Sequence, residues 1–242
     1  MSCNYQPDED TVCFIDSFSR DQRGLTQQYL DALLSLKTKR IVFISETEHI
    51  GVQIKRTLDH NRANVFTVNH TEPIPTASEI ISIVQAERPS YIIYHLTPDS
   101  IAPLVATCKL RFITRCQINL TDHAFWLGDN TIFDYSFEFR KRGVLVSNVF
   151  RGFNKEQLVL LPYYPWIDGA AFQGFPINSE GKIVLFSGGA LYKTEDKDGT
   201  YFRILKEILE RHHDVVFFYA GDGDKSHFTA LSKRILLKKE CF

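Results

Sequence analysis

The chain has 242 residues and a formal net charge of −1 at neutral pH, and 44% of its residues are hydrophobic. This length and composition are sufficient for one or two domains with a proper core, and the balanced charge argues against the basic surface of a nucleic-acid-binding protein. The 19 Phe and 10 Tyr residues exclude a chain that is disordered throughout.

The cysteines and the N-terminus indicate a reducing compartment. Five cysteines, an odd number, occur without any CxxC spacing, and Cys13 and Cys116 fall within apolar strands. We interpret them as small buried hydrophobic residues. The sequence begins with no basic stretch followed by an apolar one, and it has no apolar run of about 18 residues. We therefore expect a soluble, cytoplasmic protein.

In the first half of the chain, short apolar runs alternate with amphipathic segments. The runs predict strands and the segments between them predict helices. The strands are expected at 11–16, 40–45, 64–69, 90–96 and 111–120, and the helices at 24–36, 47–60, 76–87 and 98–108. Continuously apolar strands are typical of a parallel sheet that helices cover on both faces. The first half therefore predicts a Rossmann-like α/β domain.

The alternation loosens after residue 120 and begins again near residue 182. We expect strands at 134–140 and 157–165, a linker over 163–181, and then two strand–helix units: strands 182–187 and 214–220, helices 200–213 and 226–240. Two units are small for a domain. We predict a first domain over 1–176 and the start of a second, incomplete domain over 177–242, although the two units could also pack onto the first domain.

Glycine-rich turns follow both strands of the second block. Gly188 and Gly189 allow the backbone to approach a ligand closely, and Lys193 is within reach of a diphosphate held there. The turn Gly221–Asp222–Gly223 follows the next strand. Ligands of open parallel sheets bind beyond the carboxyl ends of strands, which favours a binding role. The structural alternative is a pair of tight turns with a solvated lysine.

The stretch "INLTDHAFWLGDNTIFDY", residues 118–135, places Asp122, His123 and Trp126 just beyond a strand. Histidine is the side chain whose ordinary pKa lies near neutrality, so His123 is a candidate general base. His95, at the end of another strand, is the competing histidine. For both histidines the alternative is a structural role, and for Trp126 it is core packing. No set of residues has metal-ligand spacing.

These segments together resemble GT-B glycosyltransferases. "SRDQRGLTQQYLDALLSL" resembles the loop and first helix of that family, and "KIVLFSGGALYKTEDKDGTYFRILKEIL" the start of its second domain. "DVVFFYAGDGDK" is similar to the second strand of that domain. "DHAFWLGDNTIFDY" is similar to a Trp-Leu-Gly segment of the relatives that include O-linked N-acetylglucosamine transferases. The resemblance covers most of residues 11–230.

The resemblance implies two Rossmann-like domains, the second truncated at its C-terminal side, and transfer of a sugar from a nucleotide-sugar to a hydroxyl acceptor in cell-surface glycan synthesis. His123 would be the base, with Asp122 and Trp126 on the acceptor side. The residues expected to meet the donor are Gly24, Gly188, Gly189, Lys193, Gly221, Asp222 and Gly223.

Under this resemblance the protein needs no metal and no cofactor, because the nucleotide-sugar is a substrate. We expect a glycan or other hydroxyl acceptor and no nucleic-acid partner. Peripheral membrane contact and the oligomeric state stay open. The alternatives are an inactive fragment, a non-enzymatic nucleotide- or sugar-binding remnant of the fold, and a nucleotide-sugar epimerase.

Overall fold

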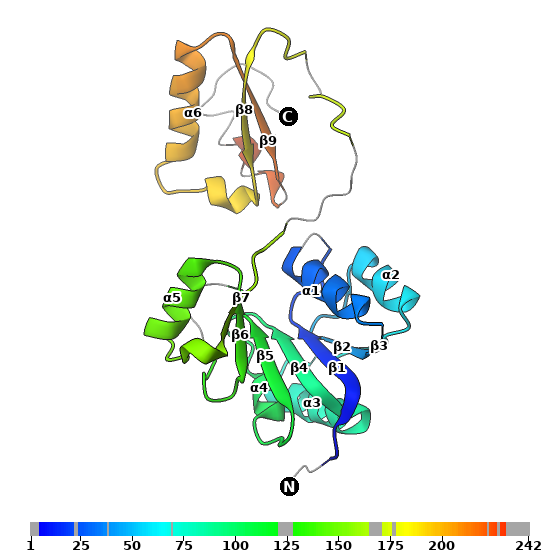
Figure 1. Ribbon diagram of the computed structural model, residues 1–242. Coiled ribbons are helices and arrows are strands. Elements are labelled where there is room, and N and C mark those ends of the chain that lie inside the picture. The colour runs from blue at the N-terminus through cyan, green and yellow to red at the C-terminus, as the bar shows by residue number, and fades with distance from the viewer. Residues whose placement is uncertain are drawn as a thin grey trace. The chain divides into compact units, whose positions relative to one another are not determined.

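A computed structural model describes residues 5–21, 24–37, 39–68, 70–120, 128–164, 171–175, 178–221, 223–226 and 228–230. The chain divides into two compact units, Met1–Asp168 and Gly169–Phe242, and each is described by itself (Figure 1). The domain boundary predicted between residues 176 and 177 stays a prediction. No helix in the described ranges is long and apolar enough to cross a membrane.

The first unit contains a seven-stranded parallel sheet with the order β3-β2-β1-β4-β5-β6-β7. The chain works outward from β1 to β3 and then returns to place β4 on the other side of β1, so the strand order reverses between β1 and β4. The strands are β1 (Asp8–Asp16), β2 (Arg40–Ser45), β3 (Asn64–Thr67), β4 (Pro89–His95), β5 (Thr114–Ile118), β6 (Tyr135–Glu138) and β7 (Leu158–Leu160).

Helices cover both faces of this sheet. Successive strand residues point to opposite sides, so the continuously apolar strands present apolar side chains on both faces. Ile15 of β1 packs with α3 and α4 on one face, and Phe14 packs with α1 and α2 on the other (Figure 1). The predicted parallel sheet with helices on both faces is thus confirmed. The helices are α1 (Gly24–Ser35), α2 (Val52–His60), α3 (Pro73–Glu87), α4 (Ala102–Thr107) and α5 (Lys141–Val149), with a short 3₁₀ turn, η1 (Lys155–Gln157).

Two cysteines lie inside this sheet as expected. Cys13 of β1 and Cys116 of β5 are buried free thiols, whereas the free thiol of Cys108, which was also expected to be buried, is exposed. Burial raises the pKa of the Cys13 thiol strongly and that of the Cys116 thiol to about 12. Both side chains therefore stay protonated and act as core residues.

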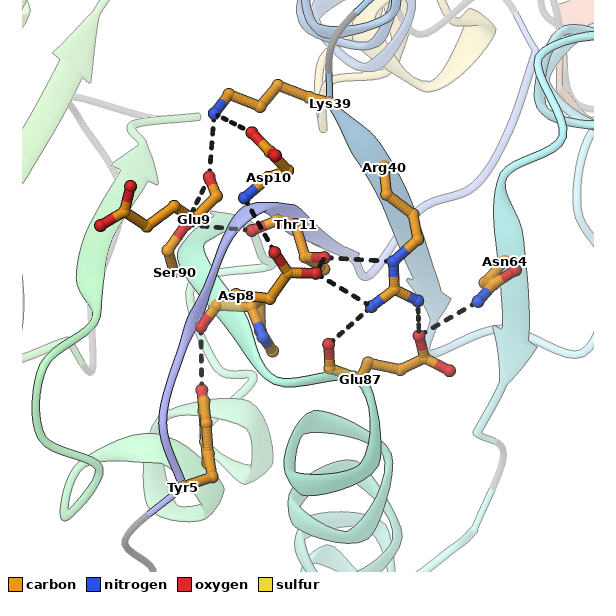
Figure 2. A network of polar contacts seen from close by, with 11 residues as sticks. Tyr5, Asp8, Glu9, Asp10, Thr11, Lys39, Arg40, Asn64, Glu87 and Ser90 are labelled. Carbon is orange, nitrogen blue, oxygen red and sulfur yellow. Dashed lines mark hydrogen bonds and ion pairs between the residues drawn. The ribbon is translucent and has the colours of Figure 1, made fainter.

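The amino edge of the sheet is closed by a network of charged side chains (Figure 2). Arg40 of β2 pairs with the Glu87 carboxylate at the end of α3, and its Nη2 donates to the Glu87 carbonyl oxygen at 2.8 Å. Its Nε donates to Thr11 Oγ1 at 3.1 Å, and its Nη2 lies 3.8 Å from Asp8 Oδ2. This edge joins β1, β2 and α3 to one another, while the carboxyl edge carries the candidate sites.

Helix α5 was missed in the sequence, where residues 121–176 showed no clear period. The residues that α5 buries are Gly143 and Ser147, which carry no apolar signal. A Cβ atom at Gly143 would lie 2.5 Å from Glu138 Oε2, so glycine lets the helix approach β6 closely. The helix therefore packs through small and polar contacts that hydrophobic periodicity does not reveal.

The second unit contains a parallel pair, β8 (Ile183–Gly188) and β9 (Val215–Ala220), with α6 (Thr200–Arg211) between them in the chain. A 3₁₀ turn, η2 (Leu191–Thr194), follows β8. Leu191, Phe202, Leu205 and Phe218 form its buried apolar part. These strands and α6 match the predicted ones closely in type and position.

Candidate functional site

The two glycine turns of the second unit form one structure. The Gly189 N–H donates to the Ala220 carbonyl oxygen at 2.9 Å. A Cβ atom at Gly221 would lie 2.0 Å from the Gly189 carbonyl oxygen, so that position has room only for glycine. Gly189 has φ 143° and Gly223 has φ 129°, which also require glycine. The structure therefore brings together Gly188, Gly189, Gly221 and Gly223, as the order of elements predicted.

Lys193 is the cationic group of this turn. It lies on η2, and its Cδ atom is 3.7 Å from the point where a Cβ of Gly189 would sit. The Tyr219 hydroxyl donates to the Gly189 carbonyl oxygen at 3.0 Å and so fixes the loop from β9. Because Ala220 accepts the Gly189 N–H, that N–H is not free to bind an anion, and the Lys193 ammonium is the cationic group that could attract one here.

The N-terminus of α6 is closed by an acidic side chain that the sequence analysis missed. Asp196 Oδ1 accepts the Thr200 N–H at 2.8 Å and the Asp198 N–H at 2.9 Å. These hydrogen bonds, the one from Thr200 first, lower the pKa of the Asp196 carboxyl. The carboxylate therefore takes the place that an anion would have at this helix N-terminus. Its signal was the Asp-x-x-Gly-Thr spacing before the helix.

In the first unit, the predicted residues lie only partly within the described structure. Gly24 begins α1 in the connection that follows β1. Asp122, His123 and Trp126, and in the second unit Asp222, lie outside the described residues. Their roles therefore stay predictions.

A buried polar cluster lies at the carboxyl ends of β1 and β4. His95 Nδ1 is 3.0 Å from Asp16 Oδ1 and 3.0 Å from Thr26 Oγ1, and all three side chains are fully buried. Asp16 also accepts the N–H groups of Phe18 and Ser19 at 3.0 and 3.1 Å. A carboxylate can only accept, so this network places a proton on Nδ1. His95 Nε2 has no hydrogen-bond partner among the described residues.

A polar hollow of about 370 Å³ opens at the same edge, on the side of α3 and α4. The carboxylate of Glu46, which follows β2, lies in its wall. Glu46 accepts hydrogen bonds from the Ser17 hydroxyl and from the Ser100 hydroxyl, the latter at 2.8 Å to Oε2 and 3.0 Å to Oε1. Burial raises the pKa of the Glu46 carboxyl, the two serines oppose that rise, and the nearby Asp16 and Asp99 charges add to it.

Glu46, Ser17 and Ser100 were not predicted as site residues from the sequence. They are separated by 29 and 54 residues along the chain. Each is a polar residue just beyond a predicted strand, and this position was the available signal. These three residues come together because of the order of the strands in the sheet. That order cannot be read from the sequence of any one segment.

No protein-family model and no curated protein matches the chain. Solved structures do match over nearly its full length. S. aureus MnaA in a co-structure with UDP is 12% identical over 96% of this chain, with a TM-score of 0.67 and 67% of its own chain covered. A glycosyltransferase from Rickettsia africae is 9% identical over 95% of this chain, with a TM-score of 0.62 and 65% covered.

The UDP-GlcNAc 2-epimerase from Neisseria meningitidis, bound to UDP-GlcNAc, is 10% identical over 93% of this chain, with a TM-score of 0.57 and 69% covered. The chain thus spans about two thirds of the length of these structures. It has the GT-B-type, Rossmann-like fold that is shared by glycosyltransferases and UDP-GlcNAc 2-epimerases, which is the fold that the sequence resemblance predicted.

Proposed function

We propose that the chain binds a nucleotide-sugar at the carboxyl edge of β8 and β9 and transfers the sugar to a hydroxyl acceptor. The observation that carries this proposal is the joining of the two glycine turns, in which Gly221 leaves room for the Gly189 carbonyl and Lys193 lies beside Gly189. Two proteins of this fold are described with UDP and with UDP-GlcNAc, respectively, which supports a nucleotide-sugar as the ligand class.

In this proposal the Lys193 ammonium attracts the diphosphate without a metal ion. Gly188, Gly221, Asp222 and Gly223 border the donor, and Gly24 flanks the phosphates from the first unit. A charge-assisted hydrogen bond from lysine to phosphate contributes about 1.5–3 kcal/mol, equivalent to roughly 10–150-fold in the dissociation constant.

For the transfer step we propose His123 as the base, with Asp122 and Trp126 holding the acceptor. The acceptor O–H bond breaks as its oxygen forms a bond to the anomeric carbon. The proton passes to the imidazole, and the nucleoside diphosphate leaves with the electron pair of the broken C–O bond. We place the reaction in cytoplasmic synthesis of cell-surface glycans.

Epimerisation of the nucleotide-sugar is the second candidate, because the Neisseria meningitidis structure of the same fold is a 2-epimerase. That reaction moves a proton at the sugar C2 carbon and leaves the sugar attached to a nucleotide at the end of the cycle. Binding without any reaction is the third.

The test is titration of UDP and UDP-GlcNAc into the full chain by calorimetry, followed by product analysis with mixed hydroxyl acceptors. Lys193→Gln is expected to weaken binding about tenfold or more. Lys182→Gln, an exposed lysine before β8, is the matched control and should bind as the parent does.

The products separate the candidates. Glycosylated acceptor together with free UDP supports transfer, a C2-epimerised nucleotide-sugar supports epimerisation, and binding without turnover supports the non-enzymatic alternative. If neither nucleotide binds, or if Lys182→Gln weakens binding as much as Lys193→Gln, the proposed donor site is wrong.

A further inference from the structure

The Glu46 hollow, the polar hollow described above, is bordered by residues that follow four strands, β1 to β4, and by the starts of two helices. Ser17 follows β1, Glu46 follows β2, and Ser100 lies between β4 and α4. Pro73 and Ala102, the first residues of α3 and α4, also line it. The hollow therefore lies beside the point where strand order reverses between β1 and β4, which is where open α/β sheets bind ligands.

The charges around the hollow disfavour an anion. Glu46, Glu72 and Asp99 all line it. Among the described lining residues, His70 is the one side chain that can become cationic, and its Nε2 already lies 2.6 Å from Glu79 Oε2. A phosphate or carboxylate placed here would face uncompensated like charges.

The helix starts are also unsuited to an anion. Helix N-termini bind phosphates through free backbone N–H groups. In α3, Pro73 and Pro75 have no N–H, and the Thr76 N–H is directed at the Glu72 carbonyl oxygen at 3.4 Å. Pro103 removes another N–H from the first turn of α4. The first turns of α3 and α4 thus offer fewer free N–H groups than a helix N-terminus that binds a diphosphate.

A metal ion is disfavoured too. Among the residues that the structure describes, no group of three or more His, Cys, Asp or Glu side chains could hold one. With anions and metal ions disfavoured, the ligands that remain for a polar hollow of about 370 Å³ are neutral molecules and organic cations. That volume lies within the range of about 300–1,000 Å³ that is usual for small-molecule sites.

The lining offers hydrogen-bond acceptors and hydroxyl groups rather than charges of both signs. A carboxylate has about four acceptor positions, and Ser17 and Ser100, with one hydroxyl proton each, occupy two of those of Glu46. The hydroxyl oxygens of both serines keep lone pairs that can accept in turn. Ile101 supplies exposed apolar surface nearby. Alternating hydroxyl and C–H groups, as on a sugar ring, complement this lining.

We propose that the Glu46 hollow binds a neutral saccharide, and that Glu46, held by Ser17 and Ser100, accepts a hydrogen bond from a sugar hydroxyl. The inference stands on the hollow alone and needs no nucleotide. Under the proposed glycosyl transfer, this saccharide would be the acceptor or part of it.

The experiment is an NMR titration of the full ¹⁵N-labelled chain with methyl glycosides of glucose, galactose and N-acetylglucosamine, without nucleotide. At least one glycoside should shift the amide signals of Ser17, Glu46 and Ser100. Glucose 6-phosphate should bind more weakly than methyl glucoside, and Mg²⁺ should leave these signals unchanged. Glu46→Gln should weaken saccharide binding about tenfold.

Glu48→Gln is the matched control, because Glu48 is exposed and is not among the described lining residues. This substitution changes the net charge by the same amount as Glu46→Gln. It should bind as the parent does. Ser100→Ala provides a second variant that keeps Glu46 and should weaken binding less than Glu46→Gln. The spectra themselves report whether each variant is folded.

The inference is overturned if no glycoside moves these signals, if glucose 6-phosphate or Mg²⁺ binds there more tightly, or if Glu46→Gln binds as Glu48→Gln does. Because no nucleotide is present, these outcomes leave the calorimetric result for UDP untouched. A failure of UDP binding likewise leaves the saccharide result untouched.

Discussion

Asp16 and His95 stand opposite each other in the register of β1 and β4, with Asp16 Oδ1 3.0 Å from His95 Nδ1. The two residues are 79 positions apart in the chain, and both side chains are fully buried. Their side chains join the carboxyl ends of β1 and β4, where the strand order of the sheet reverses. This buried polar contact therefore lies at the same carboxyl edge of the sheet as the candidate sites of the first unit.

Asp16→Asn is expected to lower the free energy of unfolding by about 1–3 kcal/mol, because it disrupts the buried hydrogen bonds that Asp16 makes with His95, Phe18 and Ser19. Urea denaturation measures the change. Asp59→Asn is the control, since Asp59 pairs with Lys55 on the exposed face of α2, and it should cost less than about 0.5 kcal/mol. Equal effects of the two variants would show that the buried pair does not stabilise the fold.

Glu46→Gln is expected to change how stability depends on pH. Burial raises the pKa of Glu46 above its ordinary 4.5, so the folded state holds this proton to higher pH than the unfolded state does. Folding stability from this group therefore falls as pH rises from 4.5 through the raised pKa.

Glutamine has no such titration. The stability of Glu46→Gln relative to the parent should thus increase as pH rises from about 4 to about 7, as measured by urea denaturation across that range. A difference that stays flat or decreases over this range would contradict the raised pKa.

Gly221→Ala is expected to destabilise the second unit and to abolish UDP binding, because the new Cβ would lie 2.0 Å from the Gly189 carbonyl oxygen. Gly181→Ala is the comparison. Gly181 has φ 69° but no atom within 4 Å of its Cβ position, so it carries only the left-handed strain of about 1–2 kcal/mol. Thermal unfolding and calorimetry test both variants. Similar behaviour would mean that the two turns do not touch.

Arg40→Gln is expected to cost about 1 kcal/mol or less and to leave ligand binding unchanged, since Arg40 is partly exposed at the amino edge of the sheet. Denaturation at low and high salt measures the effect, which should shrink as salt screens the pair with Glu87. A loss of UDP or saccharide binding in this folded variant would contradict the assignment of both sites to carboxyl edges.

His123→Ala is expected to lower turnover by roughly 10²–10⁴-fold in any glycosyl transfer that the chain performs, with little change in UDP affinity. The matched variant His95→Asn alters the competing histidine. Rate measurements across pH compare them. A drop of less than about threefold for His123→Ala would assign His123 a structural role.

The strands β1, β2 and β4 were predictable because each contains a continuous apolar run, and such runs occur in sheets buried on both faces. The contact between the Gly189 and Gly221 turns was predictable as well, since both follow neighbouring strands in the same short block. In these cases the information is local in the sequence.

Helix α5 and the Glu46 hollow were not predictable in this way. The helix buries Gly143 and Ser147, which give no apolar period. The hollow joins Ser17, Glu46 and Ser100 through strand pairing over long sequence separations. Each of these features depends on tertiary neighbours, which no single segment specifies.

The buried Glu138 carboxylate connects α5 to the residue that follows the end of β5. It accepts hydrogen bonds from Asn119 at 2.6 Å and from Ser147 of α5 at 2.6 Å. A side chain larger than glycine at position 143 would displace this carboxylate and disturb its hydrogen bond with Asn119, which lies four residues before His123 in the sequence. A substitution at position 143 of α5 can therefore change the conformation around Asn119, although no proposed ligand contact is itself substituted.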